Sequence, residues 1–177
     1  MRSLKYAILG LIIRNPISGY DIMKEFNEGL ANFWSAKHSQ IYPELKKLVD
    51  EGLVEFKVII TGTVLEKKLY SITEKGKEDF LLWLSQIEPL EPTPKEVFRL
   101  RMYYANHIEK EHLKKMLQDQ LDQRLQKLNY LQTAMNDYQE VPATTDTAFG
   151  DYIVLDGAIL REESSIQWLE NCLQHLE

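Results

Sequence analysis

The chain has 177 residues, of which 44% are hydrophobic, 27% charged and 10% aromatic, the composition of a globular protein with one large domain or two small ones. A single cysteine excludes an intrachain disulfide. The longest apolar run, residues 6–13, is shorter than the roughly 20 residues that span a bilayer, and it lacks the basic leader and small-residue cleavage site expected of a signal peptide. We therefore expect a cytoplasmic protein without a membrane partner.

The net charge of −6 argues at first against a nucleic-acid partner, because phosphate contacts need lysine and arginine. The charge is unevenly distributed, with +3 on residues 1–77 and −9 on residues 78–177. This asymmetry predicts two modules with different partners, one of which can still bind an anion.

The first fifty residues predict three short helices. Residues 4–13 form the first, which Asn15-Pro16 ends. Ser18 is a candidate N-cap for the second, whose buried positions are either Tyr20, Met23 and Phe26 or Ile22 and Phe26. Ser39 is a candidate cap for the third, with Pro43 at the edge of its first turn and Gly52 after its end. The predicted inward side of this helix is Ile41, Leu45 and Leu48, and the outward side is Gln40, Glu44, Lys46 and Lys47.

After Gly52 the hydrophobic period changes from helical to alternating. Residues 54–60 and 67–72 predict two strands around the turn Thr61-Gly62-Thr63. Thr73 then caps a fourth helix through Gln86, with Phe80, Leu84 and Ile87 on one side. Three short helices followed by a hairpin is the order of a winged helix-turn-helix.

The segment 88–94 has three prolines and predicts a stiff linker. The expected domains are therefore 1–88 and 89–177. Leucine-rich helices are expected over 95–105, over 108–138 and from 147 onward, and they cannot bury all of their apolar faces against one another. A second copy is the economical partner. The predicted fold class is mainly α: a winged helix-turn-helix of three helices and a two-stranded wing, followed by an all-helical dimerisation domain.

The sequence offers no catalytic, metal or cofactor site. The four histidines are scattered, and neither a metal-ligand spacing nor a glycine-rich phosphate loop occurs. We therefore expect a protein that is not an enzyme and needs no metal or cofactor. A helical protein-interaction adaptor, with the winged helix as a scaffold only, is an alternative from another class.

The start of the third helix is the best candidate for DNA contact. Helix N-termini favour phosphate, glutamine can pair with an adenine edge, and Tyr42 can reach phosphate or a thymine methyl. An ordinary solvated helix start explains the same residues, but the hydroxyls and lysines of the wing favour DNA. The candidates here are Lys37, His38, Ser39, Gln40, Tyr42, the outward Lys46, and Lys67 and Lys68 on the returning strand.

Three segments carry a more specific signal: LGLIIRNPISGYDI (9–22), SQIYPELKKLVDEGLV (39–54) and KKLYSITEKGK (67–77). They resemble the PadR family of bacterial winged-helix transcriptional regulators. FG-x-Y-x-VL (149–155), Arg161-Glu162 and WLE (168–170) extend the resemblance to the phenolic-acid-responsive members, which have a long helical C-terminal domain.

The resemblance implies a homodimeric repressor on a palindromic operator of a phenolic acid decarboxylase gene, released by p-coumaric, ferulic or caffeic acid. It adds Ser18, Gly19 and Tyr20 at the opening of the second helix, and Gly62 and Thr63 at the wing tip, to the DNA-contacting residues. Val64 stands where the resembling repressors tend to carry a lysine. A PadR-like regulator of a stress or efflux gene with a different aromatic ligand is the nearest alternative.

A phenolic acid needs a flat apolar slot and a cation for its carboxylate. Phe98, Met102 and Tyr152 are candidates for the slot, and Arg101 or Arg161 for the cation. Each has a simple alternative role in helix packing or on the surface.

Overall fold

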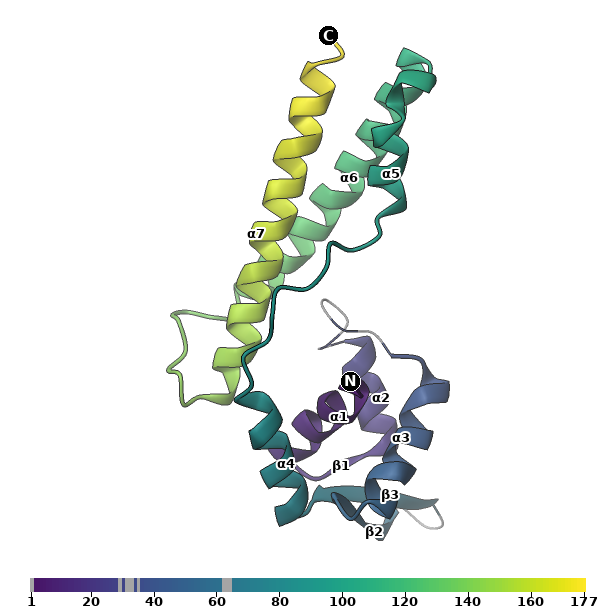
Figure 1. Cartoon of the computed structure of the whole chain (residues 1–177). Coiled ribbons are helices and arrows are strands. Elements are labelled where there is room, and N and C mark those ends of the chain that lie inside the picture. The colour runs from purple at the N-terminus through teal and green to yellow at the C-terminus, as the bar shows by residue number, and fades with distance from the viewer. Residues whose placement is uncertain (1, 29, 31–33, 35, 62–64) are drawn as a thin grey trace. The chain divides into compact units, whose positions relative to one another are not determined.

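The computed structural model describes residues 2–28, 30, 34, 36–61 and 65–177, and the side chains of His38, Thr61 and Leu65 also lie outside the description. The chain divides into two compact units, residues 1–89 and 90–177 (Figure 1). The first contains helices and a small sheet, and the second is helical. The predicted fold class is confirmed.

The N-terminal unit begins with α1 (Ser3–Arg14). A two-residue strand, β1 (Ile17–Ser18), leads into α2 (Gly19–Asn27). The Ser18 hydroxyl accepts a hydrogen bond from the backbone N–H of Asp21, so the predicted cap is confirmed. Ile22 and Phe26 are the buried pair of α2, whereas Tyr20 is 67% exposed, which decides between the two predicted stripes.

Helix α3 (His38–Asp50) begins earlier than predicted, because Lys37 and not Ser39 is the N-cap residue. Pro43 therefore lies inside the helix and not at the edge of its first turn, so the carbonyl of Ser39 has no N–H four residues ahead from which to accept a hydrogen bond. Ile41, Leu45 and Leu48 are buried as predicted.

The end of α3 has the predicted glycine. Gly52 adopts a φ of +69°, in the left-handed region that favours glycine. The N–H groups of Gly52 and Leu53 donate to the carbonyls of Val49 and Leu48, which closes the helix as a Schellman motif and turns the chain into the sheet.

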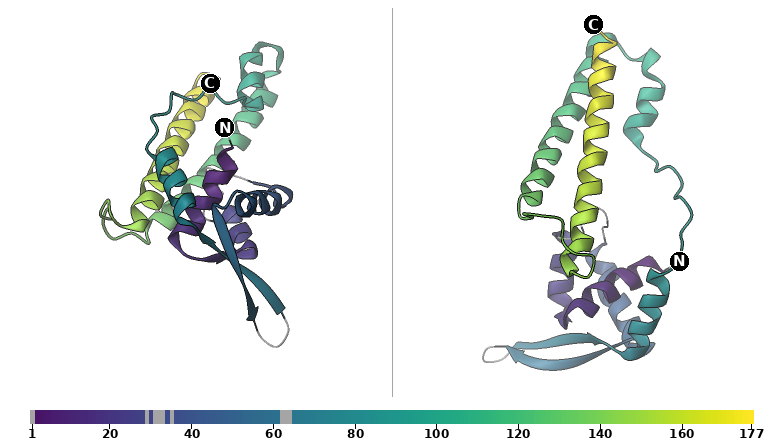
Figure 2. Two further views of the ribbon diagram at one scale, coloured as in Figure 1. Left: turned by 60° about the horizontal axis from the view of Figure 1, so that its bottom comes forward. Right: turned by 90° about the vertical axis from the view of Figure 1, so that its left-hand side faces the viewer.

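The sheet has the strand order β1-β3-β2, with β2 (Val54–Thr61) and β3 (Leu65–Ile72) antiparallel. The predicted two-stranded hairpin thus gains β1, which pairs Ile17 with Tyr70 and Ser18 with Leu69. Figure 2 shows the hairpin projecting beyond the helices of its unit. Of the alternating residues on β2, Val54 is buried, but Val58 and Ile60 are exposed because they lie beyond the core.

Helix α4 (Glu74–Leu84) closes the unit. The Thr73 hydroxyl caps it by accepting from the N–H of Gly76. Phe80 packs into the core, but Leu84 and Ile87, predicted to share its side, are 59% and 99% exposed; Leu84 is the last residue of the helix and Ile87 lies beyond it.

The C-terminal unit consists of α5 (Val97–Tyr103), a 3₁₀ turn (Ala105–His107), α6 (Lys110–Met135) and α7 (Thr147–Gln174). Helices α6 and α7 run side by side as a long antiparallel pair (Figures 1 and 2). Helix α6 begins two residues later and ends three residues earlier than the predicted range of 108–138. Neither unit contains a helix, within the described residues, that is long and apolar enough to cross a membrane.

The distribution of net charge differs when the chain is divided at the observed boundary between the two units, after residue 89. Residues 1–89 carry equal numbers of acidic and basic side chains, and residues 90–177 carry the entire net charge of −6. The predicted +3 on the N-terminal module depended on ending the count at Lys77, because Glu78, Asp79 and Glu88 follow. Any attraction to phosphate must therefore come from local groups of lysines.

Candidate nucleic-acid interface

An open groove of about 440 Å³ crosses the N-terminal unit where the start of α2, the first half of α3 and strand β3 meet. It joins residues that are more than fifty positions apart in the sequence. Its lining residues are Ser18, Gly19, Tyr20, Tyr42, Glu66, Lys67, Lys68 and Tyr70. All but Glu66 and Tyr70 were predicted from the sequence to contact DNA.

Gly19 allows α2 and α3 to approach one another at the floor of this groove. A β-carbon at this position would lie 2.8 Å from Cε1 of Tyr42, closer than nonbonded carbon atoms tolerate. The Gly19 position is therefore a packing requirement for the Tyr42 ring, in addition to opening a helix.

Asp21 connects α2 to the wing. The Ser18 hydroxyl donates to Oδ2 of Asp21 over 2.6 Å, and Nζ of Lys67 lies 2.9 Å from the same oxygen. The hydrogen bond from Ser18, followed by that from Lys67, holds the pKa of Asp21 below its usual value. Lys67 is thus fixed at the groove by an ion pair, a partner that the sequence did not reveal.

Two further residues complete the groove from β3. Nζ of Lys68 lies 4.2 Å from the ring centroid of Phe56, a cation–π contact with the neighbouring strand. Burial, with a smaller contribution from Tyr42, raises the pKa of the Tyr70 phenol, so its hydroxyl is protonated at neutral pH and can donate or accept a hydrogen bond.

The candidate residues on α3 do not share one face. Ser39, Tyr42 and Lys46 follow the spacing of three and seven that places side chains on one side of a helix, and all three are exposed. Gln40 is two positions from Tyr42 and points to another side, where its Oε1 accepts from the backbone N–H of Lys37 over 3.0 Å. Gln40 therefore caps the helix and leaves its amide NH₂ to donate.

The remaining DNA candidates are distributed as follows. Lys37 is exposed at the N-cap of α3, outside the groove lining. Gly62 and Thr63 lie outside the described residues, as does the side chain of His38. Sequence reasoning missed Asp21 and Tyr70, although Asp21 belongs to the SGYD segment that carries part of the family resemblance.

The effector candidates lie in two separate places on the C-terminal unit. Phe98 and Met102 of α5 pack against Leu117, Leu121, Ile166 and Leu169, and the Phe98 ring meets Trp168 edge to face at 6.2 Å. Tyr152 instead meets Tyr138 at 5.4 Å. Tyr152 and Trp168 are sixteen residues apart on one helix, roughly 24 Å, so one chain does not bring Tyr152 into the same slot as Phe98.

The two candidate cations for the effector carboxylate also lie at different places in the C-terminal unit. Arg101 is exposed on α5, beside Met102, and Arg161 is exposed on α7, between the two aromatic clusters. Within the described residues, no group of three histidine, cysteine, aspartate or glutamate side chains is placed to hold a metal ion.

Three helices, a capped helix start beside a lysine- and tyrosine-lined groove, and a projecting hairpin define a winged helix-turn-helix DNA-binding protein. Residues 8–81 match the transcriptional regulator PadR-like family, and residues 94–177 match the virulence activator alpha C-term family. The chain belongs to the PadR family of transcriptional regulators. Membership of this family confirms the prediction of a regulator and not an enzyme.

A relative of known function supports this assignment along the whole chain. The negative transcriptional regulator PadR of Bacillus subtilis is 43% identical, over 100% of this chain and 99% of its own length. Its crystal structure in complex with operator DNA covers 99% of this chain and 100% of its own, with a TM-score of 0.94. Its structure in complex with p-coumaric acid is 40% identical in the aligned region, covers 99% of both chains and gives a TM-score of 0.88.

Proposed function

We propose that this protein is a homodimeric transcriptional repressor that binds a palindromic operator through its two winged helices and is released by a phenolic acid. The observation that carries the proposal is the groove, which joins the start of α2, the Tyr42 face of α3 and the lysines of β3. The full-length similarity to a negative regulator whose structures contain operator DNA and p-coumaric acid supports it. A repressor of this kind acts in the cytoplasm, where the chromosome lies.

Each part of the groove is proposed to contact a different part of the DNA duplex. Lys68, with Lys67 held beside it by Asp21, brings positive charge to the phosphates, and the exposed side of the first half of α3 presents Tyr42 and Lys46 to the base edges. Because the N-terminal unit is neutral as a whole, affinity depends on these local lysines and falls steeply with salt.

A gel shift with DNA from upstream of the chain's own gene and of neighbouring genes tests this function. Tyr42→Ala is expected to abolish specific binding, whereas Gln40→Ala, which removes a capping side chain at the edge of the site, weakens it less. Lys68→Ala lowers affinity and the salt slope, while Lys24→Ala, which removes an exposed lysine outside the groove, serves as its charge-matched control. If Tyr42→Ala binds the site as the parent does, the DNA-binding surface is wrongly assigned.

The dimer is proposed from the apolar surface that one C-terminal unit leaves uncovered. Ile153 and Leu160 of α7 are 49% and 58% exposed, and Gly157 lies between them on the same side, where a β-carbon would meet no atom within 4 Å. A second copy can cover this strip closely. Leu160→Asp is expected to shift a dimer toward monomer in sedimentation analysis; Gln167→Asp, an exposed polar position of α7, is the control.

The effector is proposed to be a hydroxycinnamic acid such as p-coumaric, ferulic or caffeic acid. Release requires that the effector bind more tightly to a dimer whose winged helices are wrongly spaced than to the DNA-bound dimer. The residues proposed to bind it are Phe98, Met102 and Arg101 around the Phe98–Trp168 ring contact, with Tyr152 and Arg161 as a second group nearer the N-terminal end of α7.

Titration of p-coumaric acid into a preformed operator complex measures the response directly. We expect submillimolar p-coumaric acid to dissociate the complex. The variants Arg101→Gln and Arg161→Gln show which of the two candidate cations binds the effector carboxylate. Cinnamic acid, which lacks the phenolic hydroxyl, is the matched control ligand. Operator binding without release at millimolar p-coumaric acid would point to a regulator of another gene with a different aromatic ligand.

A further inference from the structure

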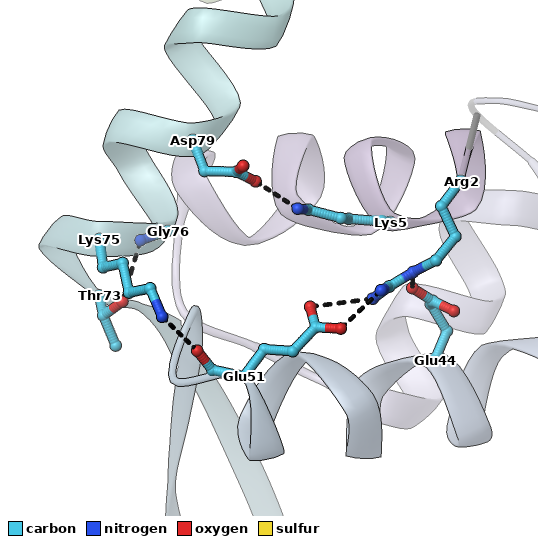
Figure 3. A network of polar contacts seen from close by, with 8 residues as sticks. All are labelled: Arg2, Lys5, Glu44, Glu51, Thr73, Lys75, Gly76 and Asp79. Carbon is cyan, nitrogen blue, oxygen red and sulfur yellow. Dashed lines mark hydrogen bonds and ion pairs between the residues drawn. The ribbon is translucent and has the colours of Figure 1, made fainter.

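A network of ion pairs joins the start of the chain to α3 and α4 (Figure 3). Arg2, just before α1, donates from Nε to Oε1 of Glu44 over 2.7 Å. It also donates from Nη1 and Nη2 to the two carboxylate oxygens of Glu51 over 2.5 and 3.1 Å. One guanidinium therefore holds a carboxylate in the middle of α3 and the carboxylate of Glu51, the C-cap residue of the same helix.

The spacing of these two carboxylates determines what the contact can do. Glu44 and Glu51 are seven residues apart, about two turns, so they project from the same side of α3. Tyr42 and Lys46 flank Glu44 by two positions and point to the opposite side. A clamp at two points on the back of a helix fixes both its rotation and its tilt, and so fixes where Tyr42 and Lys46 project.

The contact is buried at one end and partly exposed at the other, with the side chains of Arg2 and Glu51 41% and 38% exposed. The side chain of Glu44 is 8% exposed, although the sequence pattern places it on the outward side of α3. The hydrogen bond from Arg2, opposed by burial, lowers the pKa of the Glu51 carboxyl. A planar guanidinium matches this arrangement, because its five donors lie in a fixed fork and a single ammonium cannot span both carboxylates in the same way.

A neighbouring ion pair supplies the comparison. Lys5, one turn along α1, lies 2.6 Å from Oδ2 of Asp79 on α4. Figure 3 shows Arg2, the N-cap residue of α1, and Lys5, in its first turn, reaching different helices: Arg2 contacts α3 and its C-cap, and Lys5 contacts α4. Both contribute to packing of the unit, but only Arg2 contacts the helix that carries the proposed DNA-reading residues.

We propose that Arg2 is a positioning residue for DNA recognition, which orients α3 through Glu44 and Glu51 so that Tyr42 and Lys46 meet the operator. This inference rests on the proposed function. It assigns a role in sequence discrimination to a side chain that does not line the groove.

The test compares full-length Arg2→Met with Lys5→Met, since each removes one positive charge from the start of the chain. Dissociation constants are measured for the operator and for a scrambled duplex of equal length, and their ratio is the readout. Arg2→Met is expected to lower the ratio at least fivefold, and Lys5→Met to leave it within twofold of the parent. Arg2→Lys should fall between, because one ammonium holds one carboxylate well.

Unfolding in urea accompanies each measurement, so that a loss of discrimination in a folded protein is separated from loss of the fold. An unchanged ratio in Arg2→Met, or an equal drop in Arg2→Met and Lys5→Met, overturns the positioning role. Should Arg2→Met fail to fold, Arg2→Lys decides by the same ratio. A parent protein that does not distinguish operator from scrambled DNA contradicts the proposed function itself.

Discussion

The two units of this chain differ in how completely they bury their apolar side chains. The N-terminal unit encloses a single core to which α1, α2, α3, α4 and the sheet all contribute. The C-terminal unit has two separate small clusters along the seam of α6 and α7, and leaves large apolar side chains such as Leu125 and Leu160 exposed. The first unit is therefore self-sufficient in packing, whereas the second is built to be completed by another surface.

The two units also differ in how their helices are aligned. Around α3, apolar contacts arrive from several directions. Along α6 and α7 the contacts lie on one seam, and between its two clusters stands Glu162, 4% exposed, with Nη1 of Arg124 at 2.8 Å and Nζ of Lys127 at 3.0 Å. A buried carboxylate that must meet two cations of the facing helix specifies register better than a uniform row of leucines does.

The largest expected loss of stability comes from a substitution in the core of the N-terminal unit. Leu48 of α3 is fully buried, so Leu48→Ala should lower the free energy of unfolding by about 3 kcal/mol, from lost transfer energy and a residual cavity. Hydrogen exchange should report the loss in residues 1–89 first. Leu82→Ala on α4, where the side chain is 68% exposed, is the matched control and should change stability by less than about 0.5 kcal/mol. Equal effects of the two substitutions would contradict the description of one enclosed core.

The next effect concerns the seam of the C-terminal unit. Glu162→Ala should lower stability by about 2 kcal/mol, less than for a fully enclosed pair, because the side chains of Arg124 and Lys127 are 33% and 48% exposed and can turn to water. Chemical denaturation followed by helical circular dichroism measures it.

The same residue predicts a pH dependence. Burial raises the pKa of Glu162, but hydrogen bonds from Arg124 and Lys127 outweigh it, and the net shift is downward from 4.5. A lowered folded-state pKa gives stability that is present above 4.5 and is lost as the pH falls through the folded-state value. Glu162→Gln should remove this part of the acid sensitivity. If the parent and this variant lose stability in parallel below pH 4.5, the ion pair does not hold the seam.

A smaller effect is expected from substituting one glycine in each of the two units. Gly19→Ala should displace the Tyr42 ring, lower stability by about 1 kcal/mol, and reduce operator affinity several-fold. Gly150→Ala in α7, where nothing lies within 4 Å of an added β-carbon, should be neutral or stabilising. Operator titrations and thermal melts on both variants measure the contrast, which disappears if Gly19→Ala binds normally.

The smallest expected effect comes from the ion pair that ties the wing to α2. Asp21→Asn should cost less than about 1 kcal/mol, because the side chains of Asp21 and Lys67 are 43% and 38% exposed. The pKa of Asp21 is lowered by Ser18 and Lys67, so its contribution is present above 3.8 and is lost as the pH falls. Denaturation at pH 7 and pH 3 measures it, with Glu28→Gln on the exposed Lys24–Glu28 pair as the control.

Local signals predicted most of the elements. The hydroxyl caps at Ser18 and Thr73, the glycine at position 52 and the buried stripe of α3 are short-range features, and each is found where it was expected. Strand β1 was missed because two residues that pair with a distant strand have no period of their own.

Long-range partners explain the other errors. Glu44 was predicted to point outward, but its partner Arg2 is 42 positions away, and the burial of Glu162 depends on Arg124, 38 positions away. The proposed phenolic-acid slot combined Phe98 with Tyr152 because both suit an aromatic ligand, and only the length and register of α7 separate them. Helical periodicity identifies the face of a residue, but not which residues of another helix stand opposite it.

At Gly76, the start of α4 meets the loop that follows α3. A β-carbon there would lie 2.0 Å from the carbonyl oxygen of Leu53, a backbone atom that has no rotamer by which to move away. Every missense change of a glycine codon introduces a β-carbon, so no amino-acid substitution at this position avoids the clash. In a saturation library of this chain selected for a folded repressor, codon 76 should therefore keep only synonymous changes.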